Sequence, residues 1–166
     1  YRILNEKTVE KIEQKSEKTE YGKFNLILYK DLIFDETHLV MQKGKISKNN
    51  PTLVRVQQSN FFHDLLNINE FGARWSVSDS MKKINDAGKG IILLIDGENQ
   101  KQDEFNEINA SRKRRTTVPN NDPRRIGIGS QILRDLGVKK IKLMGSEVRY
   151  PSLSGFDLEV TEYIKK

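Results

Sequence analysis

The apolar run Gly90–Ile95 is the feature that most constrains the fold of this chain. It contains no polar side chain and is closed by the turn pair Asp96-Gly97. A short apolar run between turn residues is typical of a buried β-strand. A single strand is not stable by itself, so the sequence predicts a sheet around this segment.

A helix is predicted directly before this strand. Met81, Ile84 and Ala87 recur at three-residue spacing, as on one face of a helix. Ser78 belongs to the residue types that cap helix starts, and Gly88 stands where a helix can end in the left-handed conformation. The pattern therefore predicts a capped helix that leads into the buried strand.

Alternating apolar residues predict further strands. Phe24, Leu26 and Leu28 occupy alternate positions, which is the two-residue period of a half-buried strand. Strands alternating with helices indicate an α/β fold with some parallel pairing. The remaining predicted elements are strands at 38–41, 52–56, 138–144 and 156–160 and a helix that runs from Gly129 to a stop at Gly137.

The first eighteen residues differ from the rest of the chain. They are rich in Glu and Lys and have few large aliphatic side chains, which predicts a helix with a narrow apolar edge. We interpret residues 1–18 as a linker or the tail of an upstream domain, and residues 19–166 as one globular domain. Residues 100–123 show no strong periodicity and are expected to form a mobile loop.

The absence of cysteine limits the chemistry. With no cysteine and two histidines, the chain has no disulfide, no thiolate nucleophile and no sulfur-ligated metal site. His63 beside Asp64 is too little for a tetrahedral metal shell, and His38 is predicted in a separate strand. We expect no metal cofactor. Since no apolar stretch approaches the roughly 20 residues of a membrane helix and no secretory leader opens the chain, we expect a soluble, cytoplasmic protein without a membrane partner.

Most of the net charge of +6 lies in one segment. Between Arg112 and Arg125 there are six basic residues and one acid, Asp122, which leaves +5 in this stretch. We interpret the segment as a solvated basic loop. The alternatives are phosphate groups of a nucleotide or of RNA, or an acidic protein. No aromatic residue interleaves the run, so stacking on single-stranded nucleic acid is not expected.

One motif carries a close resemblance. Ile126-Gly-Ile-Gly-Ser-Gln-Ile-Leu-Arg-Asp-Leu-Gly-Val138, followed by 140–144 and 155–160, is similar to the C-terminal part of GTP cyclohydrolase II. Residues 19–24 resemble the start of that domain, and 88–94 resemble the strand before its nucleotide-binding loop. The resemblance implies a GTP cyclohydrolase II-like mixed sheet with flanking helices.

The opening residues 1–9 resemble the tail of dihydroxybutanone phosphate synthase. In bifunctional riboflavin-biosynthesis proteins that synthase lies directly upstream of the cyclohydrolase domain. The resemblance implies that this chain corresponds to the C-terminal half of such a protein and has the synthase domain as its partner. It also implies a homodimer, because family cyclohydrolases are usually dimers.

In the family, zinc held by three cysteines activates a water that opens the imidazole ring of GTP, and formate and pyrophosphate leave. The resemblance places Asn60, Trp75 and Val77 at the three cysteine positions. None of these side chains is a thiolate, and Trp75 and Val77 are expected to pack in the core. The resemblance therefore implies that the family zinc site is absent.

Other family positions are carried over by resemblance. The acid and arginine assigned in the family as general base and nucleophile fall on Asp122 and Arg124, although a surface ion pair is the alternative interpretation. Substrate-binding positions fall on Arg55, Glu98 and Arg149.

Three functions follow from these observations. The leading prediction is a catalytically inactive cyclohydrolase-like domain that is structural or regulatory for the upstream synthase and can retain residual GTP binding. The first alternative is an active GTP cyclohydrolase II. The second alternative is an RNA- or protein-binding module that uses the basic loop.

Overall fold

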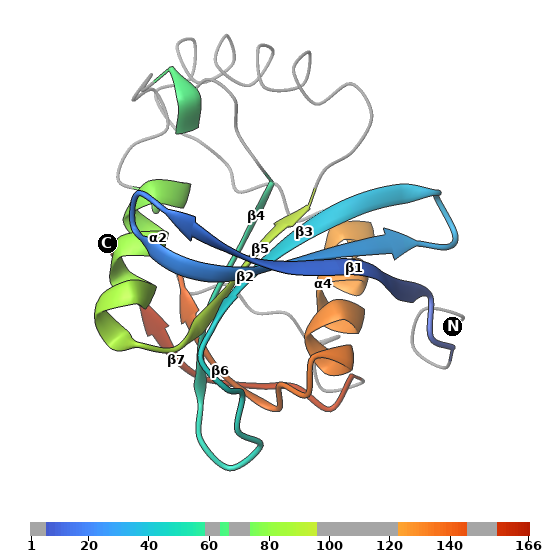
Figure 1. The fold of residues 1–166 in the computed structure, drawn as a ribbon. Helices are drawn as coiled ribbons and strands as arrows, with labels where there is room; N and C mark the ends of the chain where they lie inside the picture. The colour runs from blue at the N-terminus through green and yellow to red at the C-terminus, as the bar shows by residue number, and fades with distance from the viewer. Residues whose placement is uncertain (1–5, 59–63, 67–73, 96–122, 146–155) are drawn as a thin grey trace, which may run out of the picture.

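The computed structural model describes residues 6–58, 64–66, 74–95, 123–145 and 156–166. Its centre is one seven-stranded sheet with the strand order β1-β2-β3-β5-β4-β6-β7 (Figure 1). The strands are β1 Val9–Thr19, β2 Gly22–Asp31, β3 Glu36–Lys43, β4 Thr52–Gln58, β5 Gly90–Ile95, β6 Lys140–Met144 and β7 Glu159–Ile164, and the helices are α2 Val77–Ala87 and α4 Pro123–Asp135.

The sheet joins an antiparallel half to a parallel half. Strands β1, β2, β3 and β5 pair antiparallel, whereas β5, β4, β6 and β7 pair parallel. Antiparallel neighbours need only short turns, but parallel neighbours need crossover connections. Helices α2 and α4 lie in the chain between the parallel strands β4, β5 and β6. The predicted α/β fold with a mixed sheet and flanking helices is therefore confirmed.

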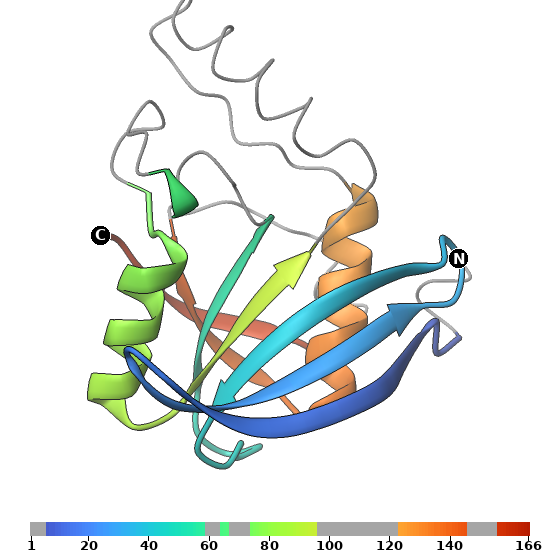
Figure 2. The same ribbon diagram turned by 45° about the horizontal axis from the view of Figure 1, so that its top comes forward.

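Helices α2 and α4 cover opposite faces of the sheet. Ile91 and Leu93 of β5 belong to one core cluster with Ile132 of α4, whereas Ile92 belongs to a second cluster with Ile84 of α2. Successive strand residues point to opposite faces, so β5 is buried on both sides. Figure 2 shows the strands passing between the two helices. Each of these five side chains is fully buried and contributes about 1.5–3 kcal/mol to the free energy of unfolding.

Two glycines make the connection from α2 to β5. Gly88 has a φ of 81° and donates from its amide to the Ile84 and Asn85 carbonyl oxygens, which is the predicted left-handed helix end. Gly90 lies so close to its neighbours that an added Cβ would stand 2.8 Å from Ile84 Cγ1 and 2.9 Å from the Leu53 carbonyl oxygen. Only glycine fits at this close approach.

The cap of α2 lies two residues before the predicted one. Ser76 Oγ accepts a hydrogen bond from the Asp79 amide at 3.1 Å, and the Ser76 carbonyl oxygen accepts from the Ser80 amide at 3.0 Å. Ser78 lies inside the helix, with its hydroxyl 3.1 Å from that of Ser76. The prediction of Ser78 as the cap was wrong because both serines carry the same capping group and the sequence pattern does not separate them.

The helix predicted over the first eighteen residues is wrong. Residues 9–19 form strand β1, which pairs with β2 from Val9↔Asp31 to Thr19↔Gly22. Glu and Lys favour helices in isolation, but backbone pairing at the edge of a sheet overrides that preference. Most β1 side chains are exposed, so the strand shows little apolar alternation. The sheet thus begins at Val9, and the assignment of the preceding residues to an upstream synthase stays a prediction.

Helix α4 begins at Pro123, six residues before the predicted start at Gly129. Proline is well suited to the first turn of a helix, and the glycine permits close packing, since a Cβ at 129 would stand 3.4 Å from Ile95 Cδ1. The other residues of the predicted loop, 100–122, lie outside the described residues.

Two predicted strands begin later than expected. Strand β6 starts at Lys140 and β7 at Glu159. Val138, Phe156 and Leu158 are buried but lie just before these strands. Burial of apolar side chains therefore extends beyond the hydrogen-bonded ladder, and apolar alternation alone does not mark where pairing starts.

Candidate functional site

The carboxyl ends of three parallel strands meet at one edge of the sheet, here called the carboxyl edge. Strand β4 ends at Gln58, β5 at Ile95 and β6 at Met144. The parallel register sets Gln58 beside Ile95, and β6 ends about level with Arg55, earlier along β4. Figure 2 shows β4 and β5 ending beside each other. Open α/β sheets bind their ligands at this edge, and the segments with the predicted metal and substrate positions follow these strand ends in sequence. The carboxyl edge is therefore the candidate functional site.

The structure describes part of the predicted site. Arg55 lies in β4, Trp75 lies just before α2, and Val77 is the first residue of α2. Arg124 lies in the first turn of α4, where only the backbone is described, so its pairing with Asp122 stays a prediction. The predicted site residues outside the described residues are Asn60, Glu98, Asp122 and Arg149.

Arg55 joins three segments of the chain at the carboxyl edge. Its Nη1 donates to the Met144 carbonyl oxygen at 2.9 Å, and its Nη2 donates to the Trp75 carbonyl oxygen at 3.1 Å. Its Nε donates to Gln57 Oε1 at 2.8 Å. A guanidinium fork is suited to several acceptors at fixed angles. All three nitrogens of Arg55 thus hold protein acceptors, which makes this side chain a connector of β4, β6 and the start of α2.

Asp64 extends this network. Its Oδ2 accepts from Gln57 Nε2 at 3.1 Å, and its Oδ1 accepts from the Val77 amide at 3.0 Å. The Val77 amide is one of the first amides of α2, which have no partner within the helix. A carboxylate at this end also interacts favourably with the helix dipole. The sequence had offered Asp64 only as a weak metal ligand beside His63, a residue outside the described ones.

Trp75 and Val77, which the sequence resemblance places at two of the family cysteine positions, have structural contacts. The Trp75 indole Nε1 donates to the Ile164 carbonyl oxygen in β7 at 3.0 Å. Both side chains are partly buried against the core cluster that contains Met81 and Ile92. An indole and an isopropyl group offer no atom that coordinates zinc, so these two side chains supply no zinc ligand.

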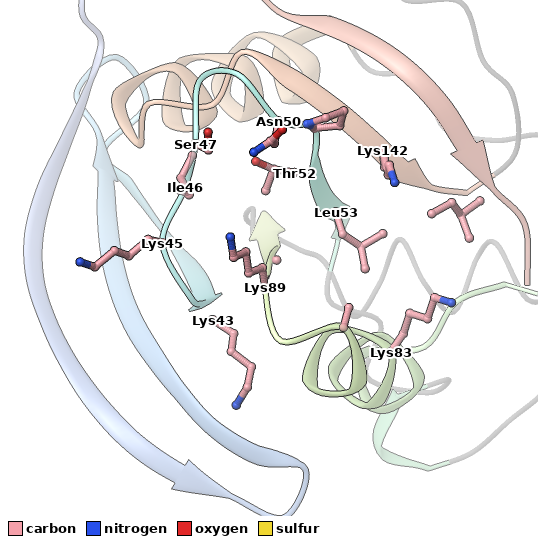
Figure 3. A pocket seen from close by; sticks show the side chains of 14 residues that line it. Lys43, Lys45, Ile46, Ser47, Asn50, Thr52, Leu53, Lys83, Lys89 and Lys142 are labelled. Atoms are coloured by element: carbon pink, nitrogen blue, oxygen red, sulfur yellow. The ribbon is translucent and has the colours of Figure 1, made fainter.

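A basic hollow lies at the opposite edge of the sheet, near the first residues of β4 and β5. Its volume is about 320 Å³, and Asn50 and Thr52 line it together with five lysines; none of the described residues that line it is a carboxylate. In Figure 3 the lysines stand around the opening. Such a lining attracts anions. The lysines are Lys43, Lys45, Lys83, Lys89 and Lys142.

The basic hollow was not predicted, because its lysines are spread over a hundred residues of sequence and only the fold brings them together. The predicted basic segment between Arg112 and Arg125 lies outside the described residues up to position 122, so its contacts stay a prediction.

Comparisons with known proteins agree on one family. The sequence matches the family described as GTP cyclohydrolase II over residues 10–165. A 3,4-dihydroxy-2-butanone 4-phosphate synthase of Pseudomonas aeruginosa is 40% identical over 99% of this chain and 45% of its own length. Riboflavin biosynthesis protein RibBA of Cytophaga hutchinsonii is 31% identical over 99% of this chain and 43% of its own length.

A solved structure has the same fold. The crystal structure of RibBX from A. baumannii, described as a two domain 3,4-dihydroxy-2-butanone 4-phosphate synthase, matches with a TM-score of 0.65 and 33% identity. The match covers 100% of this chain and 43% of the other. This chain therefore spans less than half the length of the relatives it matches. Among the described residues, no helix is long and apolar enough to cross a membrane.

Proposed function

Since this chain belongs to the GTP cyclohydrolase II family, we propose that it is a member that no longer opens the GTP ring and instead supports a 3,4-dihydroxy-2-butanone 4-phosphate synthase domain in the same protein. The single observation that carries the proposed loss of GTP ring opening is the absence of cysteine from the sequence. Zinc activates water only when its ligands hold it with one position open. Without the three thiolates, the family reaction has no zinc-activated water.

The carboxyl edge supports this proposal. A pseudo-active site that had recently lost its ligands would leave a cavity or unsatisfied polar groups at the vacated positions. Instead, Trp75 packs against the core and donates to β7, and the Val77 amide is bonded to Asp64. Arg55, a predicted substrate contact, holds two carbonyl oxygens and Gln57. These side chains stabilise the fold at the place where the family performs chemistry.

The names of the relatives support the proposed role toward a synthase domain. The P. aeruginosa and A. baumannii proteins are both named as the synthase, and the A. baumannii protein is described as having two domains. This chain matches 45% and 43% of them. A domain that is kept without its own reaction contributes through assembly or regulation. We therefore assign this chain a structural or regulatory role toward a synthase domain, as part of a homodimeric cytoplasmic protein, with residual GTP binding as one possible regulatory input.

The inactive state is tested by incubating the purified chain with GTP, Mg²⁺ and added Zn²⁺ and measuring formate and pyrophosphate. We expect neither product. A family cyclohydrolase with its three cysteines intact is the positive control. Release of both products that a chelator abolishes would overturn the proposal and establish the alternative, an active GTP cyclohydrolase II.

The supporting role is tested separately in the two-domain protein. The rate of 3,4-dihydroxy-2-butanone 4-phosphate formation and the oligomeric state are compared with and without this chain, and with GTP titrated into the intact protein. We expect removal of the chain to lower the rate or to change the assembly. An unchanged rate together with unchanged assembly would refute the supporting role and leave the inactivity result intact.

A further inference from the structure

Three side chains of metal-ligand type lie together in the hairpin formed by β2 and β3. They are Asp31, the last residue of β2, and Glu36 and His38 in β3. Asp31 pairs directly with Glu36, and His38 pairs directly with Tyr29. Because directly opposed residues share a face and side chains alternate along a strand, all of these side chains lie on the same face of the sheet.

The ligand atoms of this hairpin cluster are close together. One carboxylate oxygen each from Asp31 and Glu36 and one ring nitrogen of His38 lie within 4.8 Å of one another. In a tetrahedral site with ligands about 2.1 Å from the metal, the ligand atoms are separated by about 3.4 Å. Small side-chain rotations, chiefly of the partly exposed Glu36, close that difference. The backbone register therefore brings the three ligands almost into a coordination shell.

Burial adds an independent observation. Asp31 is only 1% exposed. Its Oδ1 accepts from the Ile33 amide at 2.9 Å, but its Oδ2 is buried and receives no hydrogen bond from the residues that the structure describes. Leaving a buried acceptor unsatisfied costs about 1–3 kcal/mol, and more for a charged group. A cation bound at Oδ2 removes that cost.

Tyr29, on the same face of the sheet, has a partner for its buried hydroxyl. Its hydroxyl donates to Asp135 Oδ2 of α4 at 2.7 Å, although it lies only two residues before Asp31. The missing partner of Asp31 Oδ2 is thus a local property of the hairpin cluster.

From these observations we propose that Asp31, Glu36 and His38 bind a divalent transition-metal ion, with zinc or manganese as the best matched. One imidazole and two carboxylates form a donor set suited to these ions, whereas calcium and magnesium prefer oxygen ligands alone. Three protein ligands leave room for water at the remaining positions. Ligands at both ends of the turn 32–35 close the hairpin, so the bound ion stabilises the antiparallel half of the sheet.

This site is separate from the zinc site of the family. Its ligands come from β2 and β3, whereas the positions that the resemblance gives to the family cysteines lie between the end of β4 and the first residue of α2. The inference does not rest on the inactivity of the domain. It does mean that zinc content alone cannot decide whether the chain is a cyclohydrolase, because a zinc ion in the hairpin would be counted without any turnover of GTP.

The experiment starts from metal-free protein prepared by dialysis against a chelator. Zinc or manganese is then titrated, and bound metal is counted by equilibrium dialysis with elemental analysis. We expect saturation at one ion per chain and a rise in the thermal unfolding midpoint on binding. Asp31→Asn, Glu36→Gln and His38→Gln should each weaken binding by about tenfold or more.

A matched control lies in the same turn. Asp35 has a φ of 56° and pairs with Lys30 at 2.8 Å, and it is not part of the cluster. Asp35→Asn removes a charge beside the site, and asparagine tolerates the left-handed conformation. We expect its metal affinity to equal that of the parent.

If a variant of the buried His38 fails to fold, Glu36→Gln at the partly exposed position keeps the test decisive. No saturable binding, or binding that survives all three ligand variants, would overturn the proposal. Turnover of GTP by the zinc-loaded parent would refute the proposed function whatever the metal content of the variants, so the two failures are distinguishable.

Discussion

The carboxyl edge and the β2–β3 hairpin differ in whether their polar groups have hydrogen-bond partners. At the carboxyl edge, Arg55 donates from all three nitrogens and both oxygens of Asp64 accept hydrogen bonds, every partner coming from the chain itself. In the hairpin, Asp31 Oδ2 is buried without a donor in the described part of the chain. Polar groups that a fold satisfies internally stabilise it, whereas a buried group without a donor indicates a missing ligand. Under the proposed function, the carboxyl edge is structural, and the unsatisfied group lies in the hairpin instead.

The interpretation of the carboxyl edge as structural would be wrong if this edge could still bind the family zinc. The triple variant Asn60→Cys, Trp75→Cys, Val77→Cys restores the three thiols, but it removes the packing of Trp75 and its hydrogen bond to Ile164. We expect the free energy of unfolding to fall by about 3–4 kcal/mol, measured by urea denaturation followed by circular dichroism.

Trp75→Phe is the matched control for the triple variant, because it keeps an aromatic ring but loses the indole N–H. We expect a loss of about 1 kcal/mol from the same measurement. A triple variant that is as stable as the parent, binds zinc at these positions and turns over GTP would show that the edge has kept an active-site geometry.

Removing Arg55 tests whether the hydrogen bonds at the carboxyl edge stabilise the fold. Arg55→Ala leaves the Met144 and Trp75 carbonyl oxygens and Gln57 without their donors, so we expect the free energy of unfolding to fall by about 2–3 kcal/mol. Lys15→Ala, at an exposed position of β1, should change it by less than about 0.5 kcal/mol. An Arg55→Ala variant with parental stability would mean that these hydrogen bonds do not stabilise the fold.

Asp64 has a smaller expected effect because it holds a helix end and one side chain. Asp64→Ala removes the acceptor of the Val77 amide and of Gln57 Nε2. We expect a loss of about 1–2 kcal/mol, measured by urea denaturation, and a smaller loss for Asp64→Asn, which keeps one acceptor. Equal stability of all three proteins would remove Asp64 from the structural network.

The parallel half of the fold was predictable from the sequence because its signals are local. The run Gly90–Ile95 is apolar without interruption because both faces are covered, and the helix before it ends at Gly88 as expected. Strand β1 was missed because it lies at the edge and its exposed Glu and Lys residues carry no apolar period. Pairing with β2 determines its structure, and pairing partners are not visible in a single sequence.

The two sites differ in the same respect. Resemblance gave Arg55, Trp75 and Val77 as site positions, but it did not give their partners. The carbonyl oxygens that Arg55 and Trp75 bind lie 20 and 89 residues away along the chain and could not be predicted. The hairpin cluster was missed because His38 was considered only with His63. The signal was present: a turn that pairs Asp31 with Glu36 also brings His38 to the same face, two residues further along β3.

The smallest predicted effect concerns Tyr29, which lies on the same face of the sheet as Asp31. Its hydrogen bond to Asp135 should make the free energy of unfolding depend on pH. Burial alone would raise the pKa of Asp135, but hydrogen bonds from Lys7 and Tyr29 outweigh it and hold this pKa below its ordinary value. A lowered carboxyl pKa contributes stability above the ordinary pKa, and the contribution is lost as the pH falls through the lowered value. Tyr29→Phe should therefore cost about 1 kcal/mol near pH 7.

The difference between Tyr29→Phe and the parent should shrink in acid, once Asp135 is protonated in both, as urea denaturation at pH 7 and below about pH 3 would measure. Tyr21→Phe, which removes a hydroxyl from the other face of the sheet, is the matched control and should show no such pH dependence. A Tyr29→Phe deficit that is equal at both pH values would mean that its hydroxyl does not stabilise the charged form of Asp135. Tyr29 could then no longer serve as the example of a buried polar group on this face that has a stabilising partner within the chain.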